Sequence, residues 1–402
     1  MTTEKLYYAD PYLQQFTANI IKAEPFADGN WAVVLDKTAF YPEGGGQPSD
    51  TGWLADIPVL AVSEKQGEIV HITAGKPAGV TVEARIDWTR RFDHMQQHSG
   101  EHLLSGVFSD LYGAENIGFH LGADSVYIDV TIESLSAEQA AVVEDTANAY
   151  IFANKPVSSR FVTEAELDNY HLRKRPAKNY ASIRLVTIAG VDCCPCGGTH
   201  VSATGEIGLV KIRSWERRAG AVRVDFVCGG RALADYRLTA NVTRELSARL
   251  SVPVAEIPGA LQRHQSKAEG LSKELAAAKQ QLNKYLAAAL YADSGPVGNA
   301  RLICRVITDV GPAELADLAR QILAAGPSVV LLAAANAELN KSQFVFACSP
   351  GLPYDMGALL KTVLPAVNGK GGGNAYSAQG GAAFSDKLED ALGLARQDIL
   401  KS

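Results

Sequence analysis

The sequence lacks the features of membrane and secreted proteins. It contains no run approaching about 18 uninterrupted apolar residues, the length of a membrane-spanning helix, and its start shows no basic-then-apolar signal pattern. Three of the six cysteines fall within four positions and the rest are scattered, which is unlike a secreted disulfide framework. They are Cys193, Cys194, Cys196, Cys228, Cys304 and Cys348. These absences predict a cytoplasmic protein that does not bind a membrane.

An excess of basic charge is also missing. The 402 residues carry a net charge of −6 at pH 7, so the composition gives no global sign of a nucleic-acid-binding protein. An RNA interface would therefore have to come from local clusters. With 47% hydrophobic, 20% charged and 7% aromatic residues, the composition is that of a globular protein with room for roughly two or three domains.

The first two segments differ in their hydrophobic pattern. Residues 1–86 contain short β-branched and aromatic stretches around the glycine-proline segment FYPEGGGQPSDTGW, which predicts a small β-barrel or sandwich. Residues 87–250 predict an α+β domain that opens with a helix. Asp87 is the expected N-cap of this helix and Gly113 its expected end, because apolar residues between them recur at helical spacing.

The last two segments are predicted to be a helical spacer and an α/β domain. In residues 251–295, two sets of residues recur every seven positions, which predicts a long helix in a coiled coil or hairpin. One set is Leu261, Ala268, Leu275, Leu282 and Ala289, and the other is His264, Leu271, Ala278 and Tyr285. The chain could form a homodimer through this spacer or through the C-terminal domain. Residues 296–402 alternate strand and helix patterns, as a small α/β domain does. The fold class of the whole chain is thus α+β.

Four residues have the types and spacings of metal ligands. His98 and His102 are four positions apart on the predicted helix, so both imidazoles can meet a single ion. In the later segment CGGTH, two glycines let the loop curl so that Cys196 and His200 face inward. A thiolate and three imidazoles suit Zn²⁺, and we expect one such ion per chain. We interpret His94, one helical turn before His98, as a structural neighbour or outer partner rather than a ligand.

Two other interpretations of these residues stay open at this point. The letters HSGEH also match the inverted zinc-peptidase signature H-x-x-E-H, in which Glu101 would activate water, although a peptidase offers no role for CGGTH. Cys193 and Cys196 form C-x-x-C, a redox motif, but no helix follows them to lower a thiol pKa. If neither interpretation applies, Glu101 is a neighbour close enough to hold a ligand ring.

Together, these motifs resemble one family. HSGEH followed by Leu103 and Leu104, and CGGTH followed by VSATGEIG, are similar to the editing domain of alanyl-tRNA synthetase and of its free-standing relatives, the AlaX proteins. YPEGGGQPSDTG resembles the glycine-rich motif that precedes this domain in the family. GKGGGNAYSAQGG is similar to the DHHA1-type domain that closes alanyl-tRNA synthetase, whose counterpart there is associated with tRNA binding. The order of segments also matches, so the resemblance covers nearly the whole chain and suggests the long AlaX form.

The resemblance implies a domain order and an activity. The expected domains are a β-barrel with the glycine-rich motif (1–86), a zinc-binding editing domain (87–250), a helical spacer (251–295) and a DHHA1-like α/β domain (296–402). The implied activity is hydrolysis of tRNA(Ala) mischarged with serine, or in some members glycine. The implied zinc ligands are His98, His102, Cys196 and His200. Met1 lies just before the barrel and nothing resembles a class II aminoacylation domain with its ATP-binding motifs, so we do not expect this chain to charge tRNA.

Local polar groups suggest substrate and tRNA contacts. Thr38 and Gln47 are candidates to bind the serine hydroxyl. Backbone amides could approach the terminal ribose and phosphate at Gly44, Gly45 and Gly46, unless these glycines only form a tight turn. Two basic clusters could bind acceptor-stem phosphates or be solvated faces. The first is Arg173, Lys174, Arg175 and Lys178. The second is Arg213, Arg217, Arg218 and Arg223, and we favour it because it follows the CGGTH segment. The last segment offers Lys370 with Gly371, Gly372 and Gly373.

Two further functions use the same motifs. The first is a non-catalytic, zinc-stabilised tRNA-binding or accessory protein, which would bind and slowly release Ser-tRNA(Ala) without hydrolysing it. The second is a hydrolase of amino-acid esters or thiol compounds unrelated to tRNA. The residues of the catalytic centre do not exclude this function, but it leaves the terminal domain without a role.

Overall fold

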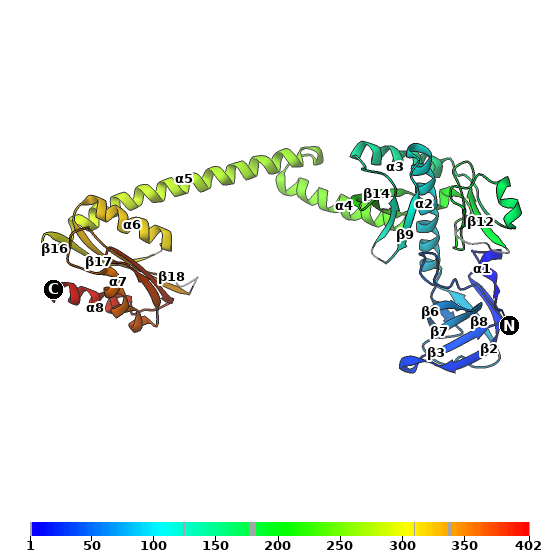
Figure 1. The fold of residues 1–402 in the computed structure, drawn as a ribbon, viewed down its shortest axis with the longest axis horizontal. Coiled ribbons are helices and arrows are strands. Elements are labelled where there is room, and N and C mark those ends of the chain that lie inside the picture. Colours follow the sequence, from blue (N-terminus) through cyan, green and yellow to red (C-terminus); the bar gives the residue numbers. More distant parts are fainter. Residues whose placement is uncertain (1, 124, 177–181, 309, 337–339, 402) are drawn as a thin grey trace. The chain divides into compact units, whose positions relative to one another are not determined.

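The computed structural model describes residues 2–401 apart from 124, 177–181, 309 and 337–339 (Figure 1). The chain divides into two compact units, Met1–Leu246 and Ser247–Ser402. None of the helices in the described residues combines the length and the apolarity that a membrane crossing requires.

The first unit begins with a closed β-barrel. Its strands follow one another around the barrel as β2 (Gln15–Pro25), β3 (Trp31–Leu35), β7 (Glu68–Thr73), β6 (Ile57–Lys65), β5 (Gly52–Leu54) and β8 (Thr81–Ile86). The two short strands β1 (Glu4–Lys5) and β4 (Lys37–Thr38) pair beside the barrel, and helix α1 (Leu6–Ala9) follows β1. Burial alternates along β8, so every second side chain points into the barrel core. Of the two expected architectures, barrel and sandwich, the structure shows the barrel.

Helix α2 (Trp88–Tyr112) carries the chain from the barrel into the next domain. The carboxylate of Asp87 accepts a hydrogen bond from the backbone N–H of Arg90, and Gly113 adopts the left-handed conformation that ends a helix. The predicted start and end of this helix are therefore confirmed. The guanidinium of Arg91 is fully buried and forms an ion pair with Asp50, so the helix is anchored to the barrel.

Two antiparallel sheets surround helix α2. The larger sheet has the order β14 (Val210–Arg218), β15 (Ala221–Cys228), β10 (Val126–Val130) and β9 (Asn116–Leu121). The smaller has the order β11 (Val157–Val162), β12 (Ile183–Ile188) and β13 (Asp192–Pro195). The apolar face of α2, helix α3 (Ala137–Phe152) and the larger sheet enclose one core. Helix α4 (Gly229–Leu250) follows β15.

The second unit is built on a six-stranded sheet. Its order is β16 (Gly295–Val297), β17 (Ala300–Thr308), β18 (Ser328–Asn336), β19 (Lys341–Cys348), β21 (Ser377–Ala383) and β20 (Lys370–Gly373), with only β17 and β18 parallel among the described residues. Alternate residues of β18 enter two different cores, so the sheet is covered on both faces. Helix α6 (Pro312–Ala325) packs into one core, and helices α7 (Met356–Val363) and α8 (Leu388–Lys401) into the other.

The predicted spacer helix is α5 (Ile257–Ala292). Its last turns pack on α6, where Lys279 pairs with Glu314 and Ala287 is buried. The residues of the predicted heptad seam are largely exposed; among them are Leu261, Leu271, Leu275, Leu282 and Tyr285. Dimerisation through this helix therefore stays a prediction.

Candidate metal centre

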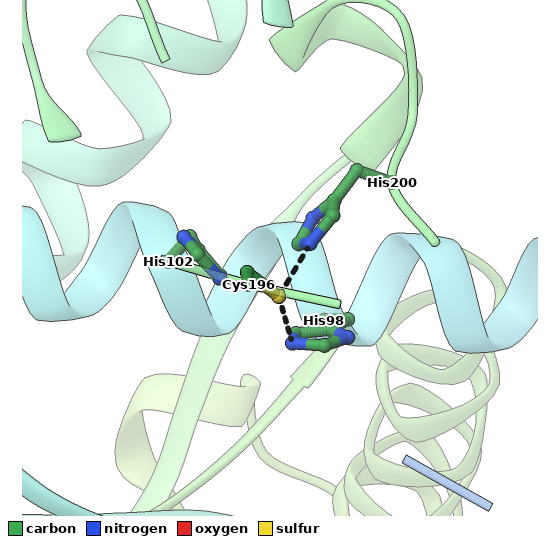
Figure 2. A group of neighbouring side chains, drawn as sticks. All are labelled: His98, His102, Cys196 and His200. Carbon is green, nitrogen blue, oxygen red and sulfur yellow. Dashed lines mark hydrogen bonds between the residues drawn. The ribbon is translucent and has the colours of Figure 1, made fainter. Parts of the chain in front are cut away.

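Two segments far apart in sequence bring four potential ligands together. His98 and His102 project from the same side of α2, and Cys196 and His200 lie on the loop that follows β13 (Figure 2). The ligand atoms of these four side chains all lie within 4.8 Å of one another. Three of the residues are buried and Cys196 is nearly so. The prediction that these residues form one potential metal site is confirmed.

Two of the separations between ligand atoms match those expected around a single ion. The Sγ atom of Cys196 lies 3.5 Å from Nε2 of His98 and 3.3 Å from Nε2 of His200 (Figure 2). Metal–nitrogen bonds of about 2.1 Å and metal–sulfur bonds of about 2.3 Å give edges of this size in a zinc tetrahedron. One soft thiolate with three imidazoles is also a donor set that suits zinc.

Each imidazole is held from behind through its Nδ1 atom. The Nδ1 of His98 is 2.8 Å from Oε1 of Gln47, and that of His102 is 2.8 Å from Oδ2 of Asp192. The Nδ1 of His200 is 3.1 Å from the hydroxyl of Ser99. In all three rings, Nε2 is therefore the atom left to face the centre. Outer partners of this kind fix the tautomer and the orientation of a metal-binding imidazole.

The charges around the cluster favour the forms of the side chains that bind a metal. Burial raises the pKa of the Cys196 thiol, but the imidazoles of His98, His200 and His102 outweigh burial and hold the pKa well below its usual value. Burial, with a contribution from His98, lowers the pKa of His200 to about 3. Thiolate and neutral imidazole are the ligand forms of these residues.

The ring of His102 behaves differently from that of His200. Burial lowers the pKa of His102, but the negative charges of Glu101, Cys196 and Asp192 raise it well above its usual value. A cation bound at this centre would therefore displace a proton from His102. The same arrangement makes the cluster attractive to cations as a whole.

Asp192 connects the cluster to an arginine that is largely buried. Its two carboxylate oxygens accept hydrogen bonds from His102 and from Nε of Arg173, at 2.8 and 2.7 Å. Arg173 is thus a partner of the metal centre rather than a free charge of the predicted basic cluster. Of the other residues in that cluster, Lys174 is exposed and Arg175 pairs with Asp168. Lys178 lies outside the described residues. Sequence patterns gave no sign of the role of Arg173, although Asp192 lies only four positions before Cys196.

The glycine-rich segment supplies the outer partner of His98. Residues 44–47 form a tight turn in which Gly44 and Gln47 exchange two backbone hydrogen bonds, and Gly46 has a φ of +85°. A Cβ atom on Gly46 would lie 2.9 Å from the carbonyl oxygen of Phe119, so only glycine fits there. The glycines do form a turn, which places Gln47 against His98 and Thr199. Their approach to a ribose stays a prediction.

The metal cluster lies in the wall of a cavity of about 510 Å³. Its lining combines the glycine turn, α2, β9 and the CGGTH loop. Among the predicted site residues it includes Gly44, Gly45, His98, Glu101, His102 and Cys196. Gly46 lies against Phe119 instead, and Gln47 against His98.

Thr38 lies outside this lining. Its side chain is completely buried beside the barrel, with Oγ1 2.8 Å from Nε2 of His71. The same hydroxyl oxygen accepts a hydrogen bond from the backbone N–H of Phe40. Thr38 therefore bonds to His71 and Phe40 and is not among the residues that line the cavity, so its contact with a substrate stays a prediction. The closeness of Thr38 to the glycine segment in the sequence could not show where its side chain lies, because the direction of a buried side chain depends on the elements that enclose it.

Glu101 lies on the inner side of the ligand rings. Its Oε2 atom is 3.6 Å from Nε2 of His102 and 4.0 Å from Nε2 of His98. The ring Nδ1 atoms are held by Gln47, Asp192 and Ser99 rather than by Glu101. His94 is buried on the same helix with its Nδ1 unpartnered, and it is not part of the cluster.

The predicted tRNA-binding arginines lie on the hairpin of β14 and β15. Arg213 pairs with Asp225, and Arg218 pairs with Glu216. Arg223 makes two hydrogen bonds to Asp129 and lies over the ring of Tyr127, so it is fixed within the sheet. Arg217 is exposed. In the second unit, Lys370 lies beside a cavity of about 570 Å³, and Gly371, Gly372 and Gly373 form the exposed edge strand β20.

Comparison with protein families assigns two parts of the first unit. Residues 183–225, which contain Cys196 and His200, match the "Threonyl and Alanyl tRNA synthetase second additional domain". Residues 2–90, the barrel, match the family described as "tRNA synthetases class II (A)". This match is confined to the barrel, and the expectation that the chain has no aminoacylation domain with ATP-binding motifs stays a prediction. The chain thus carries a domain type shared by threonyl- and alanyl-tRNA synthetases.

Whole-chain relatives give the family itself. The chain is 32% identical over 392 residues to the alanyl-tRNA editing protein AlaX-L of Pyrococcus horikoshii, covering 94% of each protein. It is 37% identical over 240 residues to the alanyl-tRNA editing protein Aarsd1 of Rattus norvegicus, covering 56% of this chain and 58% of that protein. The chain belongs to the alanyl-tRNA editing protein family.

The chain also resembles larger proteins and a solved domain. It is 31% identical to the alanine–tRNA ligase of Pyrococcus furiosus over 97% of its own length but only 43% of the ligase. The crystal structure of the C-Ala domain of Aquifex aeolicus alanyl-tRNA synthetase is 29% identical, with a TM-score of 0.25, and covers 27% of this chain and 99% of that domain.

Proposed function

We propose that this chain is a zinc-dependent hydrolase that removes serine, and glycine as a second substrate, from mischarged tRNA(Ala). The observation that carries the proposal is a cluster of one thiolate and three imidazoles, each ring held by an outer partner, in the wall of a cavity of a chain of the alanyl-tRNA editing family. Hydrolysis breaks the ester bond between the amino acid and the terminal ribose. Water adds to the carbonyl carbon and the ribose hydroxyl leaves.

The side chains present fit one zinc ion, held by His98, His102, Cys196 and His200. Zinc would supply a Lewis acid for the ester carbonyl, which requires that one of the four ligands be displaced or that the ion accept a fifth. The protein's own contribution is orientation: Gln47, Asp192 and Ser99 hold the imidazoles, and the cavity walls hold the aminoacyl group. An aminoacyl ester is already activated, so positioning accounts for much of the catalysis expected here.

We propose the tRNA contacts from exposure and lining. Gly44 and Gly45 line the cavity and are the candidates to approach the terminal ribose. Arg217 and Arg218 on β14 are exposed and would bind acceptor-stem phosphates, Arg218 by exchanging its pair with Glu216 on the same strand. Arg213 and Arg223 form ion pairs with Asp225 and Asp129 and support the sheet. Lys370 and Gly371–Gly373 would bind tRNA in a DHHA1-like second unit. Charge contacts of this kind weaken as salt is added.

A deacylation assay tests the proposed function. Purified protein is incubated with Ser-, Gly- and Ala-tRNA(Ala), with and without a chelator, and the remaining aminoacyl-tRNA is measured. We expect hydrolysis of Ser-tRNA(Ala), sparing of Ala-tRNA(Ala) and loss of activity after chelation. Equal rates on serine and alanine would refute the specificity, and binding of Ser-tRNA(Ala) without hydrolysis would favour a non-catalytic tRNA-binding protein.

A further inference from the structure

Glu101 is a buried carboxylate held by only one of its oxygens. The residue is 5% exposed and lines the cavity between the two histidines of α2. Its Oε1 atom accepts hydrogen bonds from the hydroxyl of Ser105 at 2.8 Å and from the side-chain amide of Asn116 at 2.6 Å. Ser105 and Asn116 also contact each other at 2.9 Å, so these three side chains form a closed set. The carboxylate is therefore fixed in place without help from the cavity.

The other oxygen, Oε2, faces the ligand centre. It lies 3.6 Å from Nε2 of His102 and 4.0 Å from Nε2 of His98, and it receives no hydrogen bond from any described residue. A buried carboxylate oxygen without a donor is costly unless a cation or a donor meets it. The free oxygen thus faces the cation-binding centre, and on the cavity side it is open to a positively charged or hydrogen-bonding group.

Glu101 differs in this respect from the other carboxylates of the lining. Glu43 is exposed, and Glu64 forms an ion pair with Lys5 at 2.8 Å. The largely buried cation of the lining, Arg173, forms an ion pair with Asp192. Within the described lining, Glu101 is the buried carboxylate that has no Lys or Arg partner.

We propose that Glu101 binds the α-ammonium group of the aminoacyl ester, and so selects substrates with a free amino group. The proposal rests on the proposed function. The α-nitrogen of an amino acid lies about 2.5 Å from its carbonyl carbon. A carbonyl held at the ligand centre therefore brings the ammonium group within reach of a carboxylate beside that centre. The resulting hydrogen bond between two opposite charges is stronger than a neutral one.

A base role for Glu101 would make a different prediction. A base acts on the attacking water, so its loss slows every ester equally, whatever stands at the α-carbon. A group that binds the α-ammonium matters only for esters that carry it. Comparing Ser-tRNA(Ala) with its α-hydroxy analogue, in which a hydroxyl of similar size replaces the ammonium, separates the two roles.

The experiment measures kcat/KM on both esters for the wild type, Glu101→Gln and Glu43→Gln. We expect the wild type to prefer the amino ester by about 10- to 100-fold, the range for a hydrogen bond to a charged group. Glu101→Gln should lose most of this preference by slowing the amino ester alone. Glu43→Gln, which removes an exposed carboxylate from the same cavity wall, should keep it. Asn116→Ala, which loosens Glu101 without removing its charge, should reduce the preference by a smaller factor.

Zinc content, measured on the same proteins, gives a readout independent of activity. We expect equal zinc in the wild type and in Glu101→Gln. A loss of zinc would show that Glu101 is a ligand, and equal slowing of both esters would show that it acts on water; either result overturns the proposal. So does an active wild type without preference. If the wild type hydrolyses neither ester, the proposed function itself fails, and the role of Glu101 fails with it.

Discussion

The barrel and the metal centre both contain buried histidines, and they use them in opposite ways. In the barrel, His71 is fully buried with both ring nitrogens engaged: Nε2 lies 2.8 Å from the hydroxyl of Thr38, and Nδ1 lies 3.0 Å from the carbonyl oxygen of Val33. In the metal centre, each of the three histidines has an outer partner only on Nδ1. Their Nε2 atoms converge on one another and on Cys196.

The difference teaches that burial does not distinguish a structural histidine from a ligand. All of these rings are at most 5% exposed. What distinguishes them is the second nitrogen, because a ring with two protein partners has no lone pair left for an ion. Three rings whose remaining nitrogens meet beside a thiolate can all bind the same ion through those nitrogens. The following changes test this comparison.

Removing a ligand should have the largest effect. His98→Ala or Cys196→Ala takes one of four donors from the centre, so we expect loss of bound zinc and a fall in deacylation of at least about 1,000-fold. His71→Gln is the matched control, since it changes an equally buried histidine and should keep its zinc. The measurements are metal content and the rate on Ser-tRNA(Ala). A His98→Ala protein with full zinc and full rate would contradict the site.

Crowding a ligand ring should come next. A Cβ atom on Gly198 would lie 2.2 Å from Cε1 of His98, so Gly198→Ala must displace the ring. We expect zinc affinity to fall by about 100-fold, the upper range for disturbed outer partners. Gly197→Ala is the control, because its Cβ atom would lie 3.4 Å from the hydroxyl of Tyr8. Competition with a zinc-binding dye measures both; equal affinities would show that the ring position is unimportant.

Removing the charge of an outer partner should lower zinc affinity by a smaller factor. Asp192→Asn keeps the shape of the side chain but removes the charge that faces His102 and Arg173. We expect zinc affinity to fall by about 10- to 100-fold. Asp129→Asn, which also removes a partner of an arginine but lies at Arg223, should leave zinc affinity unchanged. If both variants bind zinc alike, Asp192 contributes to folding only.

The smallest expected effect is a loss of stability in acid, caused by the buried histidine of the barrel. Burial lowers the pKa of His71 to about 4, against about 6.5 in an unfolded chain. The unfolded chain therefore binds the proton first, and this contribution to stability is present above pH 6.5 and lost as the pH falls toward 4. Between pH 7 and 5 the loss should be about 2 kcal/mol.

The acid effect is measured as a difference between two proteins. Denaturant unfolding of the wild type and of His71→Gln is followed at pH 7 and pH 5, and the change with pH is compared. The pH dependence of zinc binding is common to both proteins and cancels. A wild type that loses no more stability than His71→Gln would show that His71 does not titrate as its burial implies.

Much of the site could be predicted from local patterns. The limits of α2 follow from Asp87 and Gly113, because capping depends on neighbouring residues alone. The pairs His98 with His102 and Cys196 with His200 follow from spacing within one helix and one loop. The class of the ligands, one thiolate and three imidazoles, also suggested zinc before any geometry was known.

The sequence by itself thus determined which residues could bind an ion and where the helix that carries two of them begins and ends. The tertiary structure alone decided which side chains bond to those residues and which other residues face the cavity. Gln47 and Asp192 reach their histidines from 51 and 90 positions away, through a turn and a strand whose packing no local pattern encodes. The same packing turned Thr38 away from the cavity and Glu101 toward it. Spacing reflects backbone geometry within one element, whereas the direction and partners of a buried side chain depend on the elements that enclose it.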